Sequence, residues 1–196
     1  FNGSYVKNHK DVIRKNPLSK EDVICIITNL KQMNRAIAIS NEEILVTNGT
    51  DPDLERYFAF GNEEMMIAEN FDELCNNDIY QIMCNCRKEE HDTILQGTNH
   101  VQITAWWDKA IDIISLNGGK GAAVVDVLKY YGISKEESIA FGDGRNDIEM
   151  LEAVGTGIAM GNASEEVKNS ADEICKPVDE DGIYHYCLDR NFFKEI

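Results

Sequence analysis

The segment that most constrains the fold of this chain is an apolar strand that leads directly into an acidic, glycine-flanked loop. Residues 139–142 (Ile-Ala-Phe-Gly) have the composition of a buried strand, and residues 143–147 (Asp-Gly-Arg-Asn-Asp) follow where a helix is expected to begin. Carboxylates at the carboxyl end of a strand lie where open α/β sheets bind their ligands. The segment therefore predicts a parallel sheet with a ligand site at one edge.

The side chains of this loop are of the types that hold a metal ion and a phosphate group. Asp143 and Asp147 offer hard oxygen ligands that suit Mg²⁺, and the amide of Asn146 can contact a phosphate oxygen. A simpler interpretation is a helix N-terminus whose aspartates only complement the helix dipole. The motif alone gives these two interpretations about equal weight.

A lysine in a glycine turn is the second candidate for the site. Residues 117–121 (Asn-Gly-Gly-Lys-Gly) place Lys120 at the start of a predicted helix, where its charge can neutralise a phosphate. The segment lacks the spacing of a Walker A loop, and a lysine in such a turn is usually only solvated. Because Lys120 and the acidic loop are one helix apart at the same edge of the sheet, we expect both to converge on one anion.

The order of the predicted elements divides the chain near residue 116. The first part alternates short strands and helices, with a helix capped by Ser19, a hairpin around Asn41 and a strand at 65–68. The second part repeats helix and strand regularly, which indicates βα units on a parallel sheet. We therefore predict an α/β fold, with a partial Rossmann-like core at residues 117–196 and a separate α/β domain at residues 4–116.

The charge of the chain argues against several kinds of partner. Its 196 residues include 19 Lys and Arg and 35 Asp and Glu, for a net charge of −16, which repels nucleic acids and anionic membranes. No apolar run approaches the roughly 20 residues that cross a bilayer, and the six cysteines lack the spacing of a disulfide framework. We expect a cytoplasmic protein that binds a small phosphorylated metabolite and neither nucleic acid nor membrane. Its oligomeric state is left open.

Four segments in a fixed order resemble the haloacid dehalogenase-like hydrolases, within them the Cof-type sugar-phosphatase branch with a large α/β cap. They are residues 119–121, 141–147, 158–163 and 179–182. The resemblance implies that residues 4–116 form the cap, that 117–196 form the C-terminal part of the core, and that 1–3 are a remnant of the connection between them. It also implies hydrolysis of small phosphate monoesters, such as sugar phosphates, with Mg²⁺ and an aspartyl-phosphate.

The same resemblance assigns roles to individual residues. Lys120 would contact the nucleophile and the phosphate, Asp143 would bind Mg²⁺ directly, and Asn146 would contact the transferring phosphoryl group. Asp147 would support either the metal or Lys120 by holding it in position. Asn2 and Gly3 would form a phosphate-binding turn.

The family's nucleophile loop, Asp-x-Asp-Gly-Thr after the first strand, is missing from these residues. Since the chain opens at Phe1 in the Asn-Gly turn, we expect it to be truncated, with its nucleophile upstream and the 196 residues alone inactive. Residues 179–182 (Asp-Glu-Asp-Gly) have a sequence similar to the missing loop. However, Pro177 interrupts the strand that would lead to them, and Ile183 stands where the threonine is expected. We expect them to form a late loop beside the site instead.

Two other functions stay open at this point. One is a non-catalytic chain that binds phosphate or a partner without turnover, and the other is a related phosphomutase or phosphotransferase. Among the remaining candidates, Cys84, Cys86 and His91 lack the paired spacing of a zinc site and are interpreted as buried thiols and a surface histidine. Trp106 and Trp107 either touch a substrate or pack inside their own domain.

Overall fold

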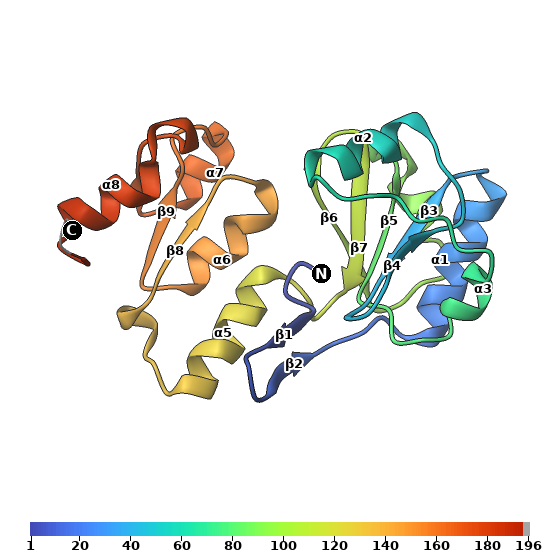
Figure 1. Cartoon of the computed structure of the whole chain (residues 1–196), viewed down its shortest axis with the longest axis horizontal. Helices are drawn as coiled ribbons and strands as arrows, with labels where there is room; N and C mark the ends of the chain where they lie inside the picture. The colour runs from blue at the N-terminus through green and yellow to red at the C-terminus, as the bar shows by residue number, and fades with distance from the viewer. Residues whose placement is uncertain (194–196) are drawn as a thin grey trace. The chain divides into compact units, whose positions relative to one another are not determined.

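The computed structural model describes residues 1–193, and the chain divides into two compact units. Unit 1 is Phe1–Gly118 and unit 2 is Gly119–Ile196 (Figure 1). Both units mix helices with strands, so the chain has the expected α/β fold class. Among the described residues, no helix combines the length and the apolar character needed to span a bilayer.

Unit 1 is built on a five-stranded antiparallel sheet with the strand order β4-β3-β5-β7-β6. Its strands are β3 (Ile37–Ser40), β4 (Leu45–Thr47), β5 (Gln81–Asn85), β6 (Val101–Trp107) and β7 (Ala110–Ser115). A separate hairpin pairs β1 (Tyr5–Lys7) with β2 (Val12–Lys15). The β3–β4 hairpin turns at Asn41 as predicted, because the Asn41 side-chain oxygen accepts hydrogen bonds from the backbone N–H groups of Glu43 and Ile44.

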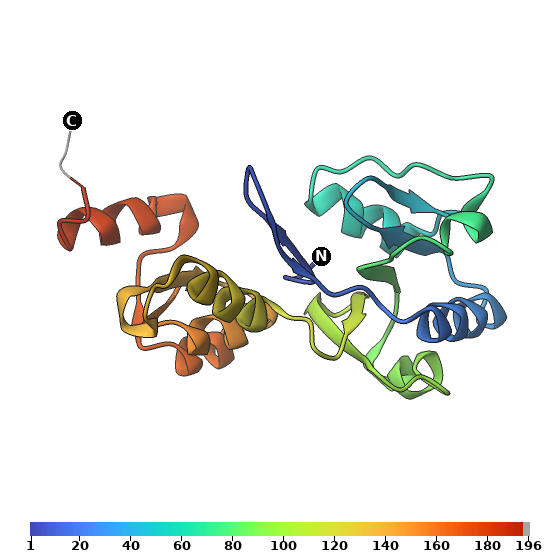
Figure 2. The same ribbon diagram turned by 90° about the horizontal axis from the view of Figure 1, so that it is seen from below.

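Helices cover both faces of this sheet (Figure 2). The helices of unit 1 are α1 (Lys20–Gln32), α2 (Pro52–Phe60), α3 (Phe71–Leu74), α4 (His91–Ile94) and the 3₁₀ turn η1 (Lys88–Glu90). The larger apolar cluster joins α1 and α4 to one face, with Ile26, Leu30 and Ile94 fully buried. A second cluster joins Leu54 and Phe58 of α2 to the other face. The sheet is therefore the middle layer of unit 1.

A buried carboxylate fixes the start of α1. Ser19 caps the helix as predicted, accepting a hydrogen bond from Asp22 N. The Asp22 side chain is itself buried and accepts hydrogen bonds from Asn99 N at 2.9 Å and His100 N at 3.4 Å. These bonds tie α1 to the two residues that directly precede β6, which begins at Val101.

We predict that Asp22→Ala destabilises unit 1 by about 2 kcal/mol, because it removes a buried acceptor and leaves the backbone N–H groups of Asn99 and His100 without their partner. Tryptophan fluorescence during urea unfolding measures this, since both tryptophans, Trp106 and Trp107, belong to unit 1. Glu21→Ala is the matched control, because Glu21 lies exposed in the same first turn. Equal midpoints for the two variants would contradict the prediction.

Unit 2 is built on a three-stranded parallel sheet with the order β10-β9-β8. Its elements are α5 (Lys120–Tyr131), η2 (Lys135–Glu137), β8 (Ile139–Gly142), η3 (Arg145–Asp147), α6 (Ile148–Ala153), β9 (Thr156–Ala159), α7 (Glu165–Ser170), β10 (Glu173–Ile174), η4 (Val178–Glu180) and α8 (Gly182–Asp189). An apolar cluster around Leu151 and Val167 joins α6 and α7 to the sheet. The parallel βα order predicted from the sequence is confirmed.

The predicted strand at residues 65–68 is wrong. The structure has only an isolated bridge there, between Thr47 and Ile67. The bridge does not extend, because its partner β4 is three residues long and ends at Thr47. Met66 and Ile67 stay 64% and 60% exposed, so they gain none of the burial that the apolar sequence suggested.

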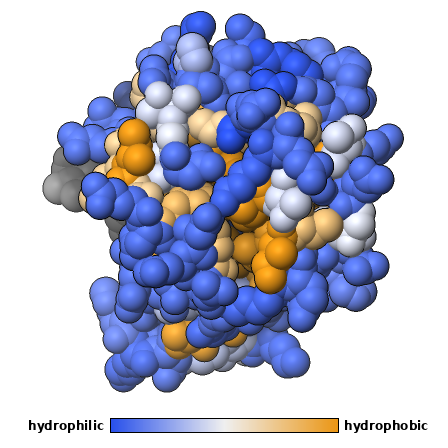
Figure 3. All heavy atoms as spheres, turned by 90° about the vertical axis from the view of Figure 1, so that its right-hand side faces the viewer, coloured by the Kyte–Doolittle hydropathy of each residue, from blue (hydrophilic) through white to orange (hydrophobic). Residues whose placement is uncertain are grey.

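The surface agrees with the acidic composition. On the face shown in Figure 3, most atoms belong to hydrophilic residues, and hydrophobic ones show through mainly near the middle. Such a surface is typical of a chain with a net charge of −16, because most charged side chains stay in water.

Candidate active site

The centre of the candidate site is an ion pair between Lys120 and Asp147. Lys120 is the first residue of α5, and its Nζ pairs with Asp147 Oδ1. The other oxygen, Asp147 Oδ2, accepts hydrogen bonds from Asp143 N at 3.1 Å and Gly144 N at 3.0 Å. Asp147 is 5% exposed, and both of its oxygens are engaged. It therefore holds the lysine and the acidic loop in one arrangement.

The glycines of the loop make this arrangement possible. A Cβ at Gly142 would lie 2.6 Å from Asp147 Cβ, and a Cβ at Gly144 would lie 2.5 Å from Asn146 Oδ1. Any larger residue at these positions would push the Asp147 and Asn146 side chains away from the loop backbone. The absence of a side chain at Gly142 and Gly144 thus leaves room for the side chains of Asp147 and Asn146 against the loop.

Asp143 lies at the exposed rim of the cluster. Its Oδ2 accepts a hydrogen bond from Asn162 Nδ2 at 3.1 Å. Asn162 follows β9, and its Oδ1 accepts a hydrogen bond from Val178 N at 3.0 Å. Asn162 therefore connects the acidic loop after β8 with the segment that opens η4, which carries part of the Asp-Glu-Asp-Gly run.

The donor chemistry of the cluster fits Mg²⁺ in part. The exposed Asp143 carboxylate is a hard oxygen ligand of the kind that this ion prefers. The oxygens of Asp147 are already bound by an ammonium and two N–H groups, which favours the supporting role over direct coordination. Within residues 1–193, no three His, Cys, Asp or Glu side chains converge as a metal-binding group. The described residues thus offer one carboxylate ligand and not a complete set.

A close helix contact sets the position of Lys120. A Cβ at Gly121 would lie 2.5 Å from the backbone oxygen of Glu149, so α5 and α6 approach each other at this point. Since Gly121 follows Lys120 directly, this contact fixes the first turn of α5 beside the helix that follows Asp147.

We predict that Gly121→Ala destabilises unit 2 by about 1–3 kcal/mol, because the added methyl group must force the two helices apart. The measurement is urea unfolding followed by circular dichroism. Val125→Ala is the control, since Val125 lies on the same helix with 53% of its surface exposed. A Gly121→Ala variant as stable as this control would contradict the close packing.

Asn2 and Gly3, the predicted phosphate-binding turn, belong to unit 1. Both have positive φ, +43° and +77°. The Asn2 side-chain nitrogen donates hydrogen bonds to Gln81 Oε1 at 3.0 Å and to Asp112 Oδ2 at 2.8 Å. The structure thus anchors this turn to strands β5 and β7, and its contact with phosphate stays a prediction.

The sequence did not point to two residues, Asn162, which bonds to Asp143, and Asp112, which bonds to Asn2. The signal available for Asn162 was its place after the strand next to β8. The carboxyl ends of adjacent parallel strands meet at one edge of the sheet. Asp112 is buried and accepts hydrogen bonds from Asn2 and Tyr57. An aspartate within an apolar strand of six buried residues was the signal available for it.

Two of the six cysteines are buried thiols of unit 1. Cys84 and Cys86 are buried in and just after β5, as interpreted from the sequence, and His91 is half-buried at the start of α4. Burial raises the pKa of the Cys86 thiol to about 11 and the pKa of Cys84 well above its ordinary value. These thiols therefore stay protonated near neutral pH, which disfavours metal binding.

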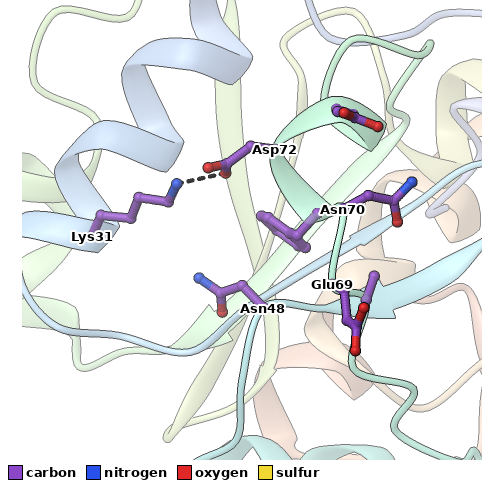
Figure 4. A pocket seen from close by; sticks show the side chains of 8 residues that line it. Lys31, Asn48, Glu69, Asn70 and Asp72 are labelled. Atoms are coloured by element: carbon purple, nitrogen blue, oxygen red, sulfur yellow. Dashed lines mark hydrogen bonds and ion pairs between the residues drawn. The ribbon is translucent and has the colours of Figure 1, made fainter.

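A polar pocket in unit 1 has unsuitable chemistry for a phosphate. It has a volume of about 480 Å³ and is lined by Lys31, Asn48, Ala68, Glu69, Asn70, Phe71, Asp72 and Glu73 (Figure 4). Of these eight residues, Lys31 is the only cation, and it points toward Asp72 and pairs with it. The surplus of carboxylates would repel an anion.

Comparison with known proteins shows the family and the fold of the chain. The model of the haloacid dehalogenase-like hydrolase family matches residues 1–187. A solved HAD subclass IIB sugar phosphatase superimposes with a TM-score of 0.88 at 26% identity, covering 98% of this chain and 74% of its own. A hypothetical protein from Geobacillus kaustophilus has a TM-score of 0.81 at 33% identity, covering 98% of this chain and 75% of its own.

A curated relative extends the comparison to sequence. The 5-amino-6-(5-phospho-D-ribitylamino)uracil phosphatase of Bacillus subtilis is 31% identical over 122 residues, which are 58% of this chain and 45% of that protein. The match thus spans less than half of the relative's length. The fold combines a unit with a parallel sheet and a second unit with an antiparallel sheet, as in these relatives. The chain belongs to the haloacid dehalogenase-like hydrolase family.

Proposed function

We propose that this chain is part of a Mg²⁺-dependent phosphatase that hydrolyses small phosphate monoesters, such as sugar phosphates, in the cytoplasm. The observation that carries the proposal is the Lys120–Asp147 pair, which is bonded to the backbone of the acidic loop at the end of a parallel strand. Family membership supports it, because the model of the haloacid dehalogenase-like hydrolases matches residues 1–187. Unit 1 would serve as the cap and unit 2 as part of the core.

In this proposal the residues of unit 2 bind and orient the phosphoryl group. The Lys120 ammonium, held by Asp147, would offset negative charge on the phosphoryl oxygens, and the Asn146 amide would donate to one of them. Asn2 and Gly3 would contribute a phosphate-binding turn. The nucleophile would be an aspartate outside these 196 residues, which forms and then loses an aspartyl-phosphate.

Asp143 would hold the metal as one of its ligands, with Asn162 fixing the orientation of the carboxylate. When bound, Mg²⁺ supplies positive charge that stabilises the transferring group. Asp147 supports both Lys120 and the Asp143 loop. This division of roles follows from the engaged oxygens of Asp147 and the exposed carboxylate of Asp143.

The test is phosphate release by the protein produced from its complete reading frame, over a panel of sugar phosphates. We expect release in the presence of Mg²⁺ and its loss when a chelator is added. Release that a chelator leaves unchanged would contradict the metal assignment, and no release from any ester would contradict the phosphatase. Transfer of the phosphoryl group to an added alcohol in place of water would identify a phosphotransferase.

A further inference from the structure

A carboxylate is buried in the sheet of unit 1. Asp112 lies within β7, a strand whose six residues are all buried, and it is itself 2% exposed. Its register partner on β5 is Met83, which belongs to the apolar cluster with α2, so Asp112 lies on the sheet face that α2 covers. A carboxylate in such a place costs free energy unless hydrogen bonds replace its lost water. The hydrogen bonds of Asp112 therefore indicate what it does there.

Both oxygens of Asp112 accept a hydrogen bond from another element. Oδ1 accepts from the Tyr57 hydroxyl of α2 at 2.5 Å, and Oδ2 accepts from Asn2 Nδ2 at 2.8 Å. Burial, followed by the charge of Asp112, raises the pKa of Tyr57 far above its ordinary value, so the hydroxyl stays protonated and remains a donor. A carboxylate accepts from both donors at once, whereas an amide of the same size has a single acceptor oxygen.

The amino group of the Asn2 side chain is fully engaged by the sheet. Besides the bond to Asp112, Nδ2 donates to Gln81 Oε1 at 3.0 Å, and an amide nitrogen has two hydrogens to donate. Gln81 is 7% exposed and lies two residues before Met83 on β5, so it shares the face of Asp112. The Asn2 amino group is therefore not available to donate to a phosphate.

The turn that contains Asn2 depends on this anchor. The Ser4 N–H donates to the Phe1 carbonyl at 2.8 Å and closes a turn in which φ is +43° at Asn2 and +77° at Gly3. Positive φ is unfavourable for a residue with a side chain, although asparagine tolerates it better than most residues do. The hydrogen bonds from Asn2 to two strands of the sheet therefore help to hold the turn in its conformation.

We propose that Asp112 is a positioning residue that holds the Asn2–Gly3 turn in its phosphate-binding conformation. The Asn2 side chain then anchors the turn, and it does not itself bind the phosphate through its amino group. The anchoring concerns unit 1 alone, whereas the binding of phosphate by the turn rests on the proposed function.

Hydrogen exchange followed by mass spectrometry of the complete protein tests the anchoring. In Asp112→Ala, the backbone amides of residues 2–5 should exchange about five- to tenfold faster, because the turn loses its main acceptor. Tyr57→Phe is the matched control, since it removes the other hydrogen bond of the same carboxylate. We expect this control to change the exchange of residues 2–5 by less than about twofold. Equal exchange in the two variants would overturn the proposal.

Calorimetric titration with inorganic phosphate in the presence of Mg²⁺ tests the consequence for the site. Asp112→Ala should weaken phosphate binding about five- to tenfold, because the competent turn is populated for only a fraction of the time. For an ester that is hydrolysed, KM should rise by a similar factor while kcat stays within about threefold. Tyr57→Phe should change both values by less than about twofold. Equal losses in the two variants would indicate a merely structural role and overturn the proposal.

A second variant removes the same anchor from the other end. Asn2→Gly lies at a partly exposed turn with positive φ, which glycine tolerates, so the fold withstands the change. It should weaken phosphate binding as Asp112→Ala does. The double variant should bind no more weakly than either single variant, because both changes remove one interaction. Additive losses, or full affinity in Asn2→Gly, would overturn the proposal.

These outcomes separate the positioning role from the phosphatase. Unchanged phosphate binding and unchanged phosphate release in Asp112→Ala would overturn the positioning role and leave the proposed function standing. Absence of phosphate release from any ester would contradict the proposed function, whereas faster exchange of residues 2–5 in Asp112→Ala would still support the anchoring of the turn.

Discussion

Replacing Asp143 by Asn in the complete protein should lower Mg²⁺-dependent phosphate release by about a hundredfold or more. The amide keeps the size of the side chain but loses the negative charge that the metal requires, while the Oδ1 of Asn still accepts a hydrogen bond. The exposed position of Asp143 means that the fold tolerates the change. Steady-state rates over a range of Mg²⁺ concentrations measure the effect.

Asp189→Asn is the matched control for this variant. Asp189 is an exposed aspartate at the end of α8, so its replacement removes the same charge from unit 2 without touching the cluster. We expect the control to retain the rate and the metal dependence of the unmodified protein. If Asp143→Asn behaved like the control, Asp143 would not be a metal ligand.

Removal of the Asp147 side chain should have the largest effect on stability. Asp147→Ala leaves the Lys120 ammonium without its partner and the N–H groups of Asp143 and Gly144 without an acceptor. We expect a loss of about 2–4 kcal/mol in the free energy of unfolding of unit 2, with most of it due to the two backbone N–H groups that lose their acceptor. Lys120 contributes less, because its side chain is 32% exposed and water solvates part of the freed charge.

Urea unfolding followed by circular dichroism measures this loss. Asp147→Asn retains one acceptor oxygen and should lie between the unmodified protein and Asp147→Ala. The activity of both variants should fall together with that of Lys120→Ala, because we propose that Asp147 acts by holding the lysine with which it pairs. A stable Asp147→Ala variant with full activity would remove the basis for treating these residues as one cluster.

Local patterns predicted much of unit 2. The alternation of helix and strand indicated the parallel order of β8, β9 and β10, and the parallel order placed Lys120 near the loop that holds Asp147. This inference worked because the carboxyl ends of neighbouring parallel strands share one edge of a sheet.

Contacts between distant residues could not be predicted in the same way. The hydrogen bond from Asn2 to Asp112 joins positions 110 residues apart, and no periodic pattern marks such a pair. The bridge at Ile67 failed to become a strand because its neighbour β4 is short, which is a property of the sheet and not of residues 65–68. The roles that we propose for Asp143 and Asp147 rest on hydrogen bonds that the sequence could not predict.

The measurement that tests the central claim most directly is mass spectrometry of the complete protein, quenched in acid during turnover of a sugar phosphate with Mg²⁺. We expect one added phosphoryl group, mapped by proteolysis to an aspartate outside these 196 residues, and none when Mg²⁺ is removed. A phosphoryl group on Asp179 or Asp181, or turnover with no protein-bound phosphoryl group at all, would contradict the account.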